Sequence, residues 1–430
     1  MGVKLGDEER GYTRFRFLSE LLVREGFAVD LITSSFQHWE KAQRDTQKAC
    51  YRGLPYRIVF IDEPGYGKNL DLARIRSHRV AAKNLRAHFE ARFSQDAHAY
   101  DLVYAEIPPN DVARVCAEEA RAHGIPFVAD INDLWPEAMR MVVNVPVVSD
   151  IAFYPFARDA RRVYELLSGA VGTSDEYAAR PAADRGGRPY PHATVYVGND
   201  LAAFDAGVAA WRDSIAKPAG EVWVAYAGTL GASYDLATLV RAAALLQDER
   251  ASKAAAQAAL ARGGAPGTDP ADPADAPLPP PVRVKILGDG PDRAKLEELA
   301  RELSAPVDFL GYTPYDRMAA WLSASDIVVN SLVKSAAQSI VTKIGDYLAS
   351  AHPMVNTGSS PEFRAKVSAD GFGVNVEAED VRALADALAK LAHSASLRKI
   401  MGAKGRAVAE REFDQPQSYR TIVNLIRNLL

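Results

Sequence analysis

Apolar runs rich in β-branched residues alternate with helix-like patterns along almost the whole chain, and this alternation narrows the possible folds more than any other feature. Strands that are followed by amphipathic helices are typical of parallel sheets with crossover helices. The alternation therefore predicts an α/β protein. The predicted strands of the first half cover 27–33, 56–61, 101–106, 126–131, 169–174 and 193–198. Those of the second half cover 222–228, 282–288, 306–311, 326–331, 353–357 and 373–377.

The length of the chain favours two domains. Its 430 residues are 48% hydrophobic, which is enough for two cores. No strand period is visible over 201–220, so we expect an N-terminal domain over 1–205 and a C-terminal domain over 206–412. A C-terminal helix over 413–430 is expected to return to the first domain. Residues 251–281 are rich in Ala, Pro, Gly and Asp and lack aromatic residues. They predict a disordered insertion, the first part of which could extend a helix.

Several function classes are disfavoured by composition. The net charge of −4 is not that of a nucleic-acid-binding protein. No apolar run of eighteen residues predicts a membrane span, and the first twelve residues are too charged for a signal peptide. Two cysteines, Cys50 and Cys116, are too few for a disulfide framework or a four-thiolate zinc site. A cytoplasmic protein is the simplest interpretation.

The stretch 338–358 contains the most informative candidate site. A helix from about 340, capped by Ser339, would carry Thr342, Gly345, Asp346 and Ala349 on one small, partly polar face. Such a face leaves room for a ligand, and Asp346 could accept hydrogen bonds from sugar hydroxyls. The free N–H groups at the start of the helix suit phosphate, and Lys343 adds a positive charge. The alternative is a surface helix with a solvated lysine.

Two glycine-containing turns follow predicted strands. The turn at 226–231, YAGTLG, permits a close approach of the backbone to a ligand. ILGDGPDR at 286–293 resembles a dinucleotide fingerprint, but Arg293 stands at the third glycine. A NAD site is therefore improbable, and a structural turn is the better interpretation.

DINDLWPEA at 130–138 follows an apolar strand, which places Asn132 and Asp133 where parallel sheets bind ligands. The alternative is a structural role, in which Trp135 and Pro136 form a packed turn and the acidic residues act only as capping residues. No Asp-x-Asp pair occurs in the chain. A metal that neutralises a diphosphate would lack its usual ligands, so we expect neither a metal nor another cofactor.

Taken together, these segments resemble the retaining glycosyltransferases of family 4, which have the GT-B fold of two Rossmann-like domains facing a central cleft. The similar segments occur in this order along the chain: GYTRFRFLSELL, DINDLWPE, VGTSDEY, VYVGNDLAAF, YAGTLG, ILGDGPDRAKLEELA, DFLGYTP and QSIVTKIGDYLASAHPMVNT. A Lys-x-x-Asp-Tyr-Leu pattern stands where relatives have two glutamates separated by seven residues. This pattern is similar to the branch that builds capsular polysaccharide and exopolysaccharide.

The resemblance implies roles for individual residues. Asp346 would bind the nucleotide ribose, and Gln338 stands where the family has a glutamate that meets the donor sugar. Thr229 and Tyr234 replace the usual basic pair, so Lys343 would supply that charge. The implied catalytic residues are Asn132, Asp133 and Lys343. The implied donor site comprises Gly228, Thr229, Leu230, Gly311, Tyr312, Gln338, Ser339, Ile340, Val341, Thr342, Lys343 and Asp346.

The beginning of the chain departs from the family. Relatives start with a strand and a glycine-rich loop, whereas here the first helix begins by about residue 13, so the first strand is expected to be missing. Its loss would expose sheet edges and part of the acceptor site. Gly11 and Arg14 fall at the end of the family's loop and are implied to lie on the acceptor side.

Residues 72–93 carry six Lys/Arg and one acid, Glu90. Leu72, Ile75, Val80, Leu85 and Phe89 are possible apolar anchors. Clustered cations attract anionic lipid by about 1 kcal/mol each. The alternative is a solvated helix face. Because the resemblance implies a lipid-linked acceptor, we expect peripheral contact with the inner face of the cell membrane.

These observations predict a retaining transferase that moves a sugar from a nucleotide-diphosphate sugar to a lipid-linked or oligosaccharide acceptor, in capsule or exopolysaccharide biosynthesis. Two alternatives remain open. One is a non-catalytic subunit that binds nucleotide sugars, and the other is a GT-B sugar-nucleotide epimerase. No nucleic-acid partner is expected.

Overall fold

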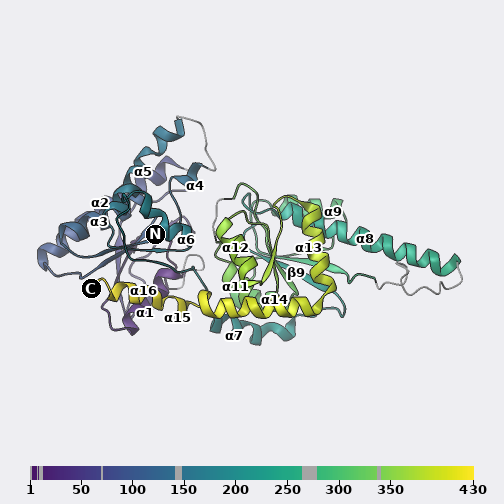
Figure 1. Ribbon diagram of the computed structural model, residues 1–430. Helices are drawn as coiled ribbons and strands as arrows, with labels where there is room; N and C mark the ends of the chain where they lie inside the picture. The colour runs from purple at the N-terminus through teal and green to yellow at the C-terminus, as the bar shows by residue number, and fades with distance from the viewer. Residues whose placement is uncertain are drawn as a thin grey trace. The chain divides into compact units, whose positions relative to one another are not determined.

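The computed structural model describes residues 2–6, 8, 13–68, 71–140, 148–263, 278–336 and 340–430. The chain forms two compact units. Unit 1 comprises residues 1–197 and 415–430, and unit 2 comprises residues 198–414. Each unit is a layered α/β structure built on parallel strands (Figure 1).

Unit 1 contains two separate parallel sheets. The larger has the order β5-β6-β7-β8, and the smaller pairs β1 with β4. Every residue of β6 is buried, because helices cover both faces of this sheet. The strands are β1 (Asp30–Ser34), β4 (Arg57–Ile61), β5 (Val103–Ile107), β6 (Phe127–Ile131), β7 (Gly169–Gly172) and β8 (His192–Thr194). A short antiparallel pair joins β2 (Phe36–Gln37) and β3 (Ala42–Gln43).

The helices of unit 1 include a segment from the end of the chain. The last helix packs Ile422 and Ile426 against Leu18 and Leu21 of the first, far apart in sequence (Figure 1). The helices are α1 (Arg14–Arg24), α2 (Leu72–Gln95), α3 (Asn110–Ala122), α4 (Glu137–Arg140), α5 (Val148–Leu166), α6 (Asp175–Ala179), α15 (Gln415–Ser418) and α16 (Arg420–Arg427).

Arg14, the first residue of α1, lies inside unit 1 with 1% of its surface exposed. Its Nε and Nη2 donate to the two carboxylate oxygens of Asp130 at 2.8 and 3.0 Å. Its Nη1 donates to the carbonyls of Val195 and Tyr196 and to the hydroxyl of Tyr419. Burial alone would lower the pKa of Arg14, but the attraction of Asp130 raises it well above its usual value. The prediction of an acceptor-side Arg14 finds no support in this geometry, because every guanidinium nitrogen already has a partner inside the unit.

The described residues before Arg14 form no strand. β1 and β5 each have a strand neighbour on one side only, within the part of the chain that the structure describes. Gly11, the other residue predicted to lie on the acceptor side, falls outside the described residues.

Unit 2 has one six-stranded parallel sheet with the order β11-β10-β9-β12-β13-β14. Its core consists of aliphatic side chains from the sheet and the covering helices, such as Val224, Ile286 and Leu388. The strands are β9 (Val222–Ala227), β10 (Val282–Leu287), β11 (Val307–Gly311), β12 (Ile327–Asn330), β13 (Met354–Asn356) and β14 (Gly373–Asn375). The helices are α7 (Leu201–Trp211), α8 (Leu236–Gly263), α9 (Arg293–Glu302), α10 (Tyr315–Ala324), α11 (Ile344–Ala349), α12 (Pro361–Asp370), α13 (Val381–His393) and α14 (Ala395–Val408).

The units divide at residues 197/198 and 414/415, whereas the sequence places these divisions at 205/206 and 412/413. Helix α7 belongs to unit 2 because it packs closely on α10. A Cβ atom at Gly207 would lie 2.7 Å from the Cα atom of Asp316, and the indole of Trp211 donates to the carboxylate of Asp316 at 2.6 Å.

Three local predictions need correction. The part of the predicted insertion at 251–263 is not disordered, because it continues α8, and 264–277 lie outside the described residues. Helix α11 begins at Ile344 and not near 340. Leu85 and Phe89 are not membrane anchors, because they are 4% and 1% exposed in the core of unit 1.

Candidate functional site

The candidate site of unit 2 lies at the carboxyl ends of its strands, where β9 separates β10 from β12 in the sheet order. This is a topological switch point, the place where open parallel sheets bind ligands. Two glycine-containing turns meet there in direct main-chain contact. A Cβ atom at Gly288 would lie 1.8 Å from the carbonyl oxygen of Gly228, and one at Gly290 would lie 2.2 Å from that of Leu230. The turn after β10 is thus a structural support for the turn after β9.

Lys343 reaches from the segment before α11 to the turn after β9. Its Nζ donates to the phenolic oxygen of Tyr226 at 3.0 Å, and this hydroxyl donates to the carbonyl of Thr229 at 2.7 Å. Nζ also lies 4.1 Å from the ring centroid of Tyr226 and 3.9 Å from that of Tyr234. A Cβ atom at position 228 would be 2.8 Å from Nζ. A larger residue at position 228 would therefore have to displace the amine of Lys343.

Burial lowers the pKa of Lys343 well below its usual value. No carboxylate lies within ion-pair distance of Nζ among the residues that the structure describes. Two aromatic rings and a phenol are weak partners for a full charge, so the free protein disfavours the protonated amine. A bound phosphate would reverse this preference. The alternative of a solvated surface lysine is wrong.

The helix at which a phosphate site was predicted begins later than expected, and phosphate binding there stays a prediction. Helix α11 has six residues and begins after Lys343. Ile340, Val341 and Thr342 therefore form the non-helical segment that leads into it. Gln338 and Ser339 lie outside the described residues. Any diphosphate stabilisation by this segment must come from the side chain of Lys343 and from main-chain groups of the turns.

Asp346, in the first turn of α11, has one anchored carboxylate oxygen. Its Oδ1 accepts from the hydroxyl of Tyr315 at 2.9 Å and from Nδ2 of Asn199 at 2.8 Å. No donor contacts Oδ2 among the described residues of unit 2. Burial raises the pKa of Asp346 to about 6, against the opposing effect of these two hydrogen bonds. The two hydrogen bonds thus hold the carboxylate in one orientation, and Oδ2 has no donor among the described residues of unit 2.

The rest of the predicted small face does not leave room for a ligand. A Cβ atom at Gly345 would lie 2.9 Å from Oδ1 of Asn199, and Ala349 is 3% exposed. Both positions are small because neighbouring chain segments pack against them.

The remaining predicted donor residues of unit 2 differ in exposure. Thr229 is exposed after β9, whereas Leu230 is fully buried in the core. The carbonyl of Gly311, at the end of β11, accepts from the amide of Gly288 at 2.7 Å. Tyr312 follows with 68% of its surface exposed. One edge of the sheet therefore holds six of the predicted donor residues, namely Gly228, Thr229, Gly311, Tyr312, Lys343 and Asp346. Leu230 packs in the core beneath this edge.

Asn132 and Asp133 lie in unit 1, directly after β6. Nδ2 of Asn132 donates to the carbonyl of Asp130 at 3.1 Å. The carboxylate of Asp133 accepts from the amide of Leu134 at 2.9 Å and from the indole of Trp135 at 3.2 Å. Burial raises the pKa of Asp133. These contacts fit a turn-forming pair, and a catalytic role for either residue stays a prediction.

Sequence reasoning missed Asn199, Tyr226 and Tyr315. Tyr226 was placed in a predicted strand and at the start of the glycine-containing turn, with no role for its side chain. Asn199 and Tyr315 are 147 and 31 residues from Asp346, so no local period connects them with it. The one available signal is an unpaired carboxylate on a largely buried helix, which needs polar partners from elsewhere in the chain.

Comparisons with known proteins bear on the fold and on part of unit 2. Residues 274–394, which include Lys343 and Asp346, match the family model of glycosyl transferases group 1. No curated protein sequence matches the chain. Among solved structures, sucrose-phosphate synthase from Thermosynechococcus elongatus is 16% identical, covers 99% of this chain and 96% of its own, and has a TM-score of 0.67.

Two other solved structures are similar over nearly the full length. Anabaena HepE in complex with UDP is 16% identical, with coverage of 96% and 95% and a TM-score of 0.64. WaaG, a glycosyltransferase involved in lipopolysaccharide biosynthesis, is 9% identical, with coverage of 99% and 97% and a TM-score of 0.59. The fold is GT-B. Its two Rossmann-like domains correspond to units 1 and 2.

In this GT-B chain, the ionised form of Asp346 costs stability. A folded-state pKa of about 6 lies above the ordinary value of 3.8, so the stability associated with the protonated form is present below about pH 4 and is lost as the pH rises through 6. Asp346→Asn keeps an Oδ1 acceptor for Tyr315 and Asn199 but removes the charge. At pH 8 we expect the free energy of unfolding of the variant to exceed that of the wild type by roughly 2–3 kcal/mol.

Urea denaturation at pH 4 and pH 8 measures this difference. The gain should disappear at pH 4, where both side chains are neutral. An equal gain at both pH values would contradict the assignment of the cost to charge. If Asp346 binds the nucleotide, the same variant should bind it more weakly despite its greater stability.

Proposed function

We propose that this chain is a retaining glycosyltransferase that moves a sugar from a nucleotide-diphosphate sugar to a saccharide acceptor in capsular polysaccharide or exopolysaccharide biosynthesis. The observation that carries the proposal is that two polar side chains occur in the same site. Lys343 lies beside the glycine turn after β9, and Asp346 has one carboxylate oxygen without a donor among the described residues. Both residues lie within the segment that matches glycosyl transferases group 1. The UDP complex of HepE, a structure of the same fold, makes a UDP-sugar the first donor to test.

In the proposed donor complex, Oδ2 of Asp346 accepts hydrogen bonds from the ribose hydroxyls. The diphosphate lies against the turn at Gly228 and Thr229, where it contacts Nζ of Lys343. Negative charge grows on the leaving diphosphate as the glycosidic bond breaks. A lysine that is fixed between two rings needs no reorganisation to stabilise this charge. Retention then uses attack from the front face, and the leaving phosphate assists deprotonation of the acceptor hydroxyl.

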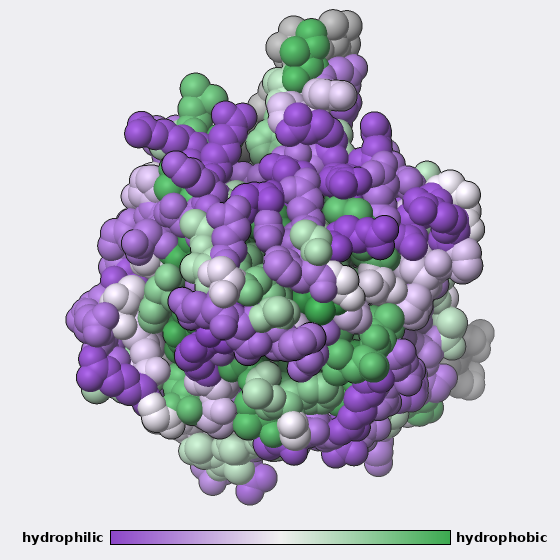
Figure 2. All heavy atoms as spheres, turned by 90° about the vertical axis from the view of Figure 1, so that its left-hand side faces the viewer, coloured by the Kyte–Doolittle hydropathy of each residue, from purple (hydrophilic) through white to green (hydrophobic). Residues whose placement is uncertain are grey.

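The proposed acceptor is a lipid-linked saccharide, which requires contact with a membrane surface. No helix among the described residues is both long and apolar enough to cross a membrane. Unit 1 instead exposes single large apolar side chains, namely Leu72 on α2 and Ile151 and Tyr154 on α5, at 82%, 72% and 60%. The face of unit 1 in Figure 2 is mostly hydrophilic, with scattered hydrophobic side chains. The exposed apolar side chains support shallow contact with a lipid surface.

A donor-consumption assay tests the proposal against its alternatives. The protein is incubated with UDP-glucose and related sugar nucleotides, with and without a lipid-linked saccharide extract. Acceptor-dependent release of nucleoside diphosphate supports transfer. Binding in a thermal-shift assay without turnover would indicate a non-catalytic subunit, and isomerised free donor would indicate an epimerase.

We expect transfer to survive excess EDTA. Lys343 and main-chain donors, not a metal, stabilise the leaving group in this proposal. No group of three or more His, Cys, Asp or Glu suited to a metal occurs among the described residues. The rate of donor consumption with EDTA should match the rate without it. A loss of activity that magnesium restores would contradict the metal-free mechanism.

A further inference from the structure

A group of basic and aromatic side chains lies on unit 1, in segments that follow three of its parallel strands. Lys41 belongs to the turn between β2 and β3, which come after β1, and Tyr66 comes after β4. Trp135 comes after β6, and Arg74 lies in the first turn of α2. Open α/β sheets bind ligands beyond the carboxyl ends of their strands. The basic–aromatic cluster consists of these four side chains and two imidazoles, namely His38, Lys41, Tyr66, Arg74, His78 and Trp135.

Both cations of the cluster lie against the ring of Tyr66. Nζ of Lys41 is 4.8 Å from the centroid of this ring, and Cζ of Arg74 is 5.5 Å from it. Cζ of Arg74 also lies 4.8 Å from the ring of Trp135. Lys41, Arg74 and Trp135 are each partly exposed. The two positive groups therefore share one aromatic neighbour and are within reach of a ligand from solvent.

The ring that the two cations share is held in place. Tyr66 is 7% exposed, and its hydroxyl oxygen lies 2.6 Å from Nδ1 of His38. A Cβ atom at Gly65 would lie 2.5 Å from the ring of Phe36, so the main chain beside Tyr66 is closely packed. Lys41 has a φ of 55°, in the left-handed region that residues other than glycine rarely adopt. Backbone strain of this kind is concentrated at functional sites.

The positive charges of the cluster repel one another. Burial and the charge of Arg74 lower the pKa of Lys41. Burial and the charges of Lys41 and Arg74 lower the pKa of His38 to about 3. Burial and the charge of Arg74 lower the pKa of His78, also to about 3. Both imidazoles are therefore neutral at pH 7, and an anion bound at the cluster would offset the repulsion between the two remaining cations.

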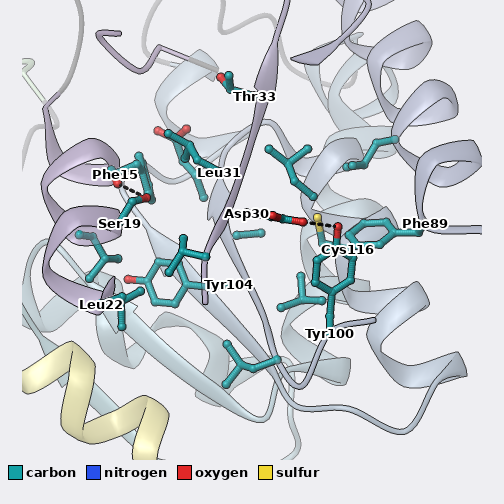
Figure 3. A pocket seen from close by; sticks show the side chains of 18 of the residues that line it. Phe15, Ser19, Leu22, Asp30, Leu31, Thr33, Phe89, Tyr100, Tyr104 and Cys116 are labelled. Carbon is teal, nitrogen blue, oxygen red and sulfur yellow. Dashed lines mark hydrogen bonds between the residues drawn. The ribbon is translucent and has the colours of Figure 1, made fainter. Parts of the chain in front are cut away.

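The cluster is distinct from the cavity of unit 1, which has a volume of about 380 Å³ (Figure 3). Apolar side chains such as Leu22 and Phe89 line this cavity, and the hydroxyl of Tyr100 donates to the carboxylate of Asp30 within it at 3.0 Å. None of the described residues that line it is a lysine, an arginine or a histidine. The cavity therefore offers no positive charge to an anion, whereas the cluster offers two.

We propose that the basic–aromatic cluster binds an oxyanion of the acceptor. This oxyanion is a phosphate of the group that links the saccharide to lipid, or the carboxylate of an acidic sugar. The guanidinium of Arg74 is a planar fork that matches either group, and Lys41 adds a second charge. The identification of the ligand as an acceptor rests on the proposed function, whereas the binding of an oxyanion does not.

Isothermal titration calorimetry of the full chain with pyrophosphate and with glucuronate tests the proposal, and glucose is the neutral probe. Saturating UDP is present throughout, so that the proposed donor site at Lys343 does not contribute. The double variant Lys41→Met/Arg74→Met should bind the anion at least roughly tenfold more weakly than the wild type, because it lacks both charged donors. The matched control, Arg76→Met/Lys83→Met, removes the same charge from exposed positions of α2 and should bind like the wild type.

The two anions distinguish the sources of the oxyanion. A loss of pyrophosphate binding in the double variant indicates the lipid linker, and a loss of glucuronate binding indicates an acidic sugar. If the double variant does not fold, Lys41→Met alone repeats the comparison at a turn position. Equal affinities of the wild type, the cluster variant and the control would overturn the proposal, as would the absence of binding of either anion to the wild type.

Failure of the proposed function has a different signature. The wild type would then still bind the anion through Lys41 and Arg74, but it would consume no sugar nucleotide in the donor assay. If both proposals hold, the cluster variant should have a raised KM for the acceptor and an unchanged KM for the donor. An unchanged KM for the acceptor would overturn the assignment of the oxyanion to this substrate.

Discussion

Replacing Lys343 with methionine is expected to lower kcat for transfer by roughly 10²–10³, as the loss of one electrostatic stabiliser can. Nζ of Lys343 lies beside Gly228, at the turn that would hold the leaving diphosphate. The charge on this group develops as the bond breaks, so a fixed lysine stabilises the transition state more than the ground state. Binding of the intact sugar nucleotide should therefore change less than kcat. Steady-state kinetics at saturating donor measure both parameters.

The matched control is Lys390→Met, the same change at an exposed lysine of α13. It should leave kcat unchanged. A value of kcat within about threefold of the wild type for Lys343→Met would mean that another group stabilises the diphosphate.

In the absence of ligand, Lys343→Met is expected to stabilise the protein, although it impairs transfer. The lowered pKa of Lys343 means that the stability associated with its neutral form is lost as the pH falls through the folded-state value. Lys343→Met should thus be more stable than the wild type at neutral pH. Donor binding to the wild type should take up protons, because phosphate raises the lysine pKa again. Calorimetry in buffers of different ionisation enthalpy detects this uptake, which the variant should lack.

Replacing Arg14 with methionine is expected to destabilise unit 1 by about 3–5 kcal/mol, the usual cost of removing one partner from a buried ion pair. The carboxylate of Asp130 is 0% exposed and would lose both of its guanidinium contacts. The hydroxyl of Tyr104, 2.7 Å from Oδ2, would remain as its donor. Urea denaturation followed by a signal from unit 1 measures the loss.

The double variant Arg14→Met/Asp130→Leu distinguishes charge from packing. Removing both charges should recover much of the lost free energy, because no ion is then left buried. A loss that is unchanged in the double variant would contradict this explanation.

The pattern of apolar runs was sufficient to predict the α/β class and the parallel strands. Strands that are buried on both faces must be continuously apolar, so each one leaves a local mark in the sequence. The placement of Asp346 on a helix after β12 was predicted from the helical period of Ile340, Ile344, Tyr347 and Leu348. The last three of these are buried side chains of α11. Local patterns of this kind report which face of an element is buried.

The partners of polar groups were decided only by the tertiary structure. Arg14 and Asp130 are 116 residues apart, and Asn199 and Asp346 are 147 apart, so no period relates them. Helix α11 begins at 344 and not near 340, and Lys343, which precedes it, contacts Tyr226 across 117 residues. Hydrogen bonds and ion pairs depend on distances of a few ångströms between atoms that only the folded chain brings together. The period of buried apolar residues can be read from the sequence, whereas the pairing of buried charges depends on the packed fold.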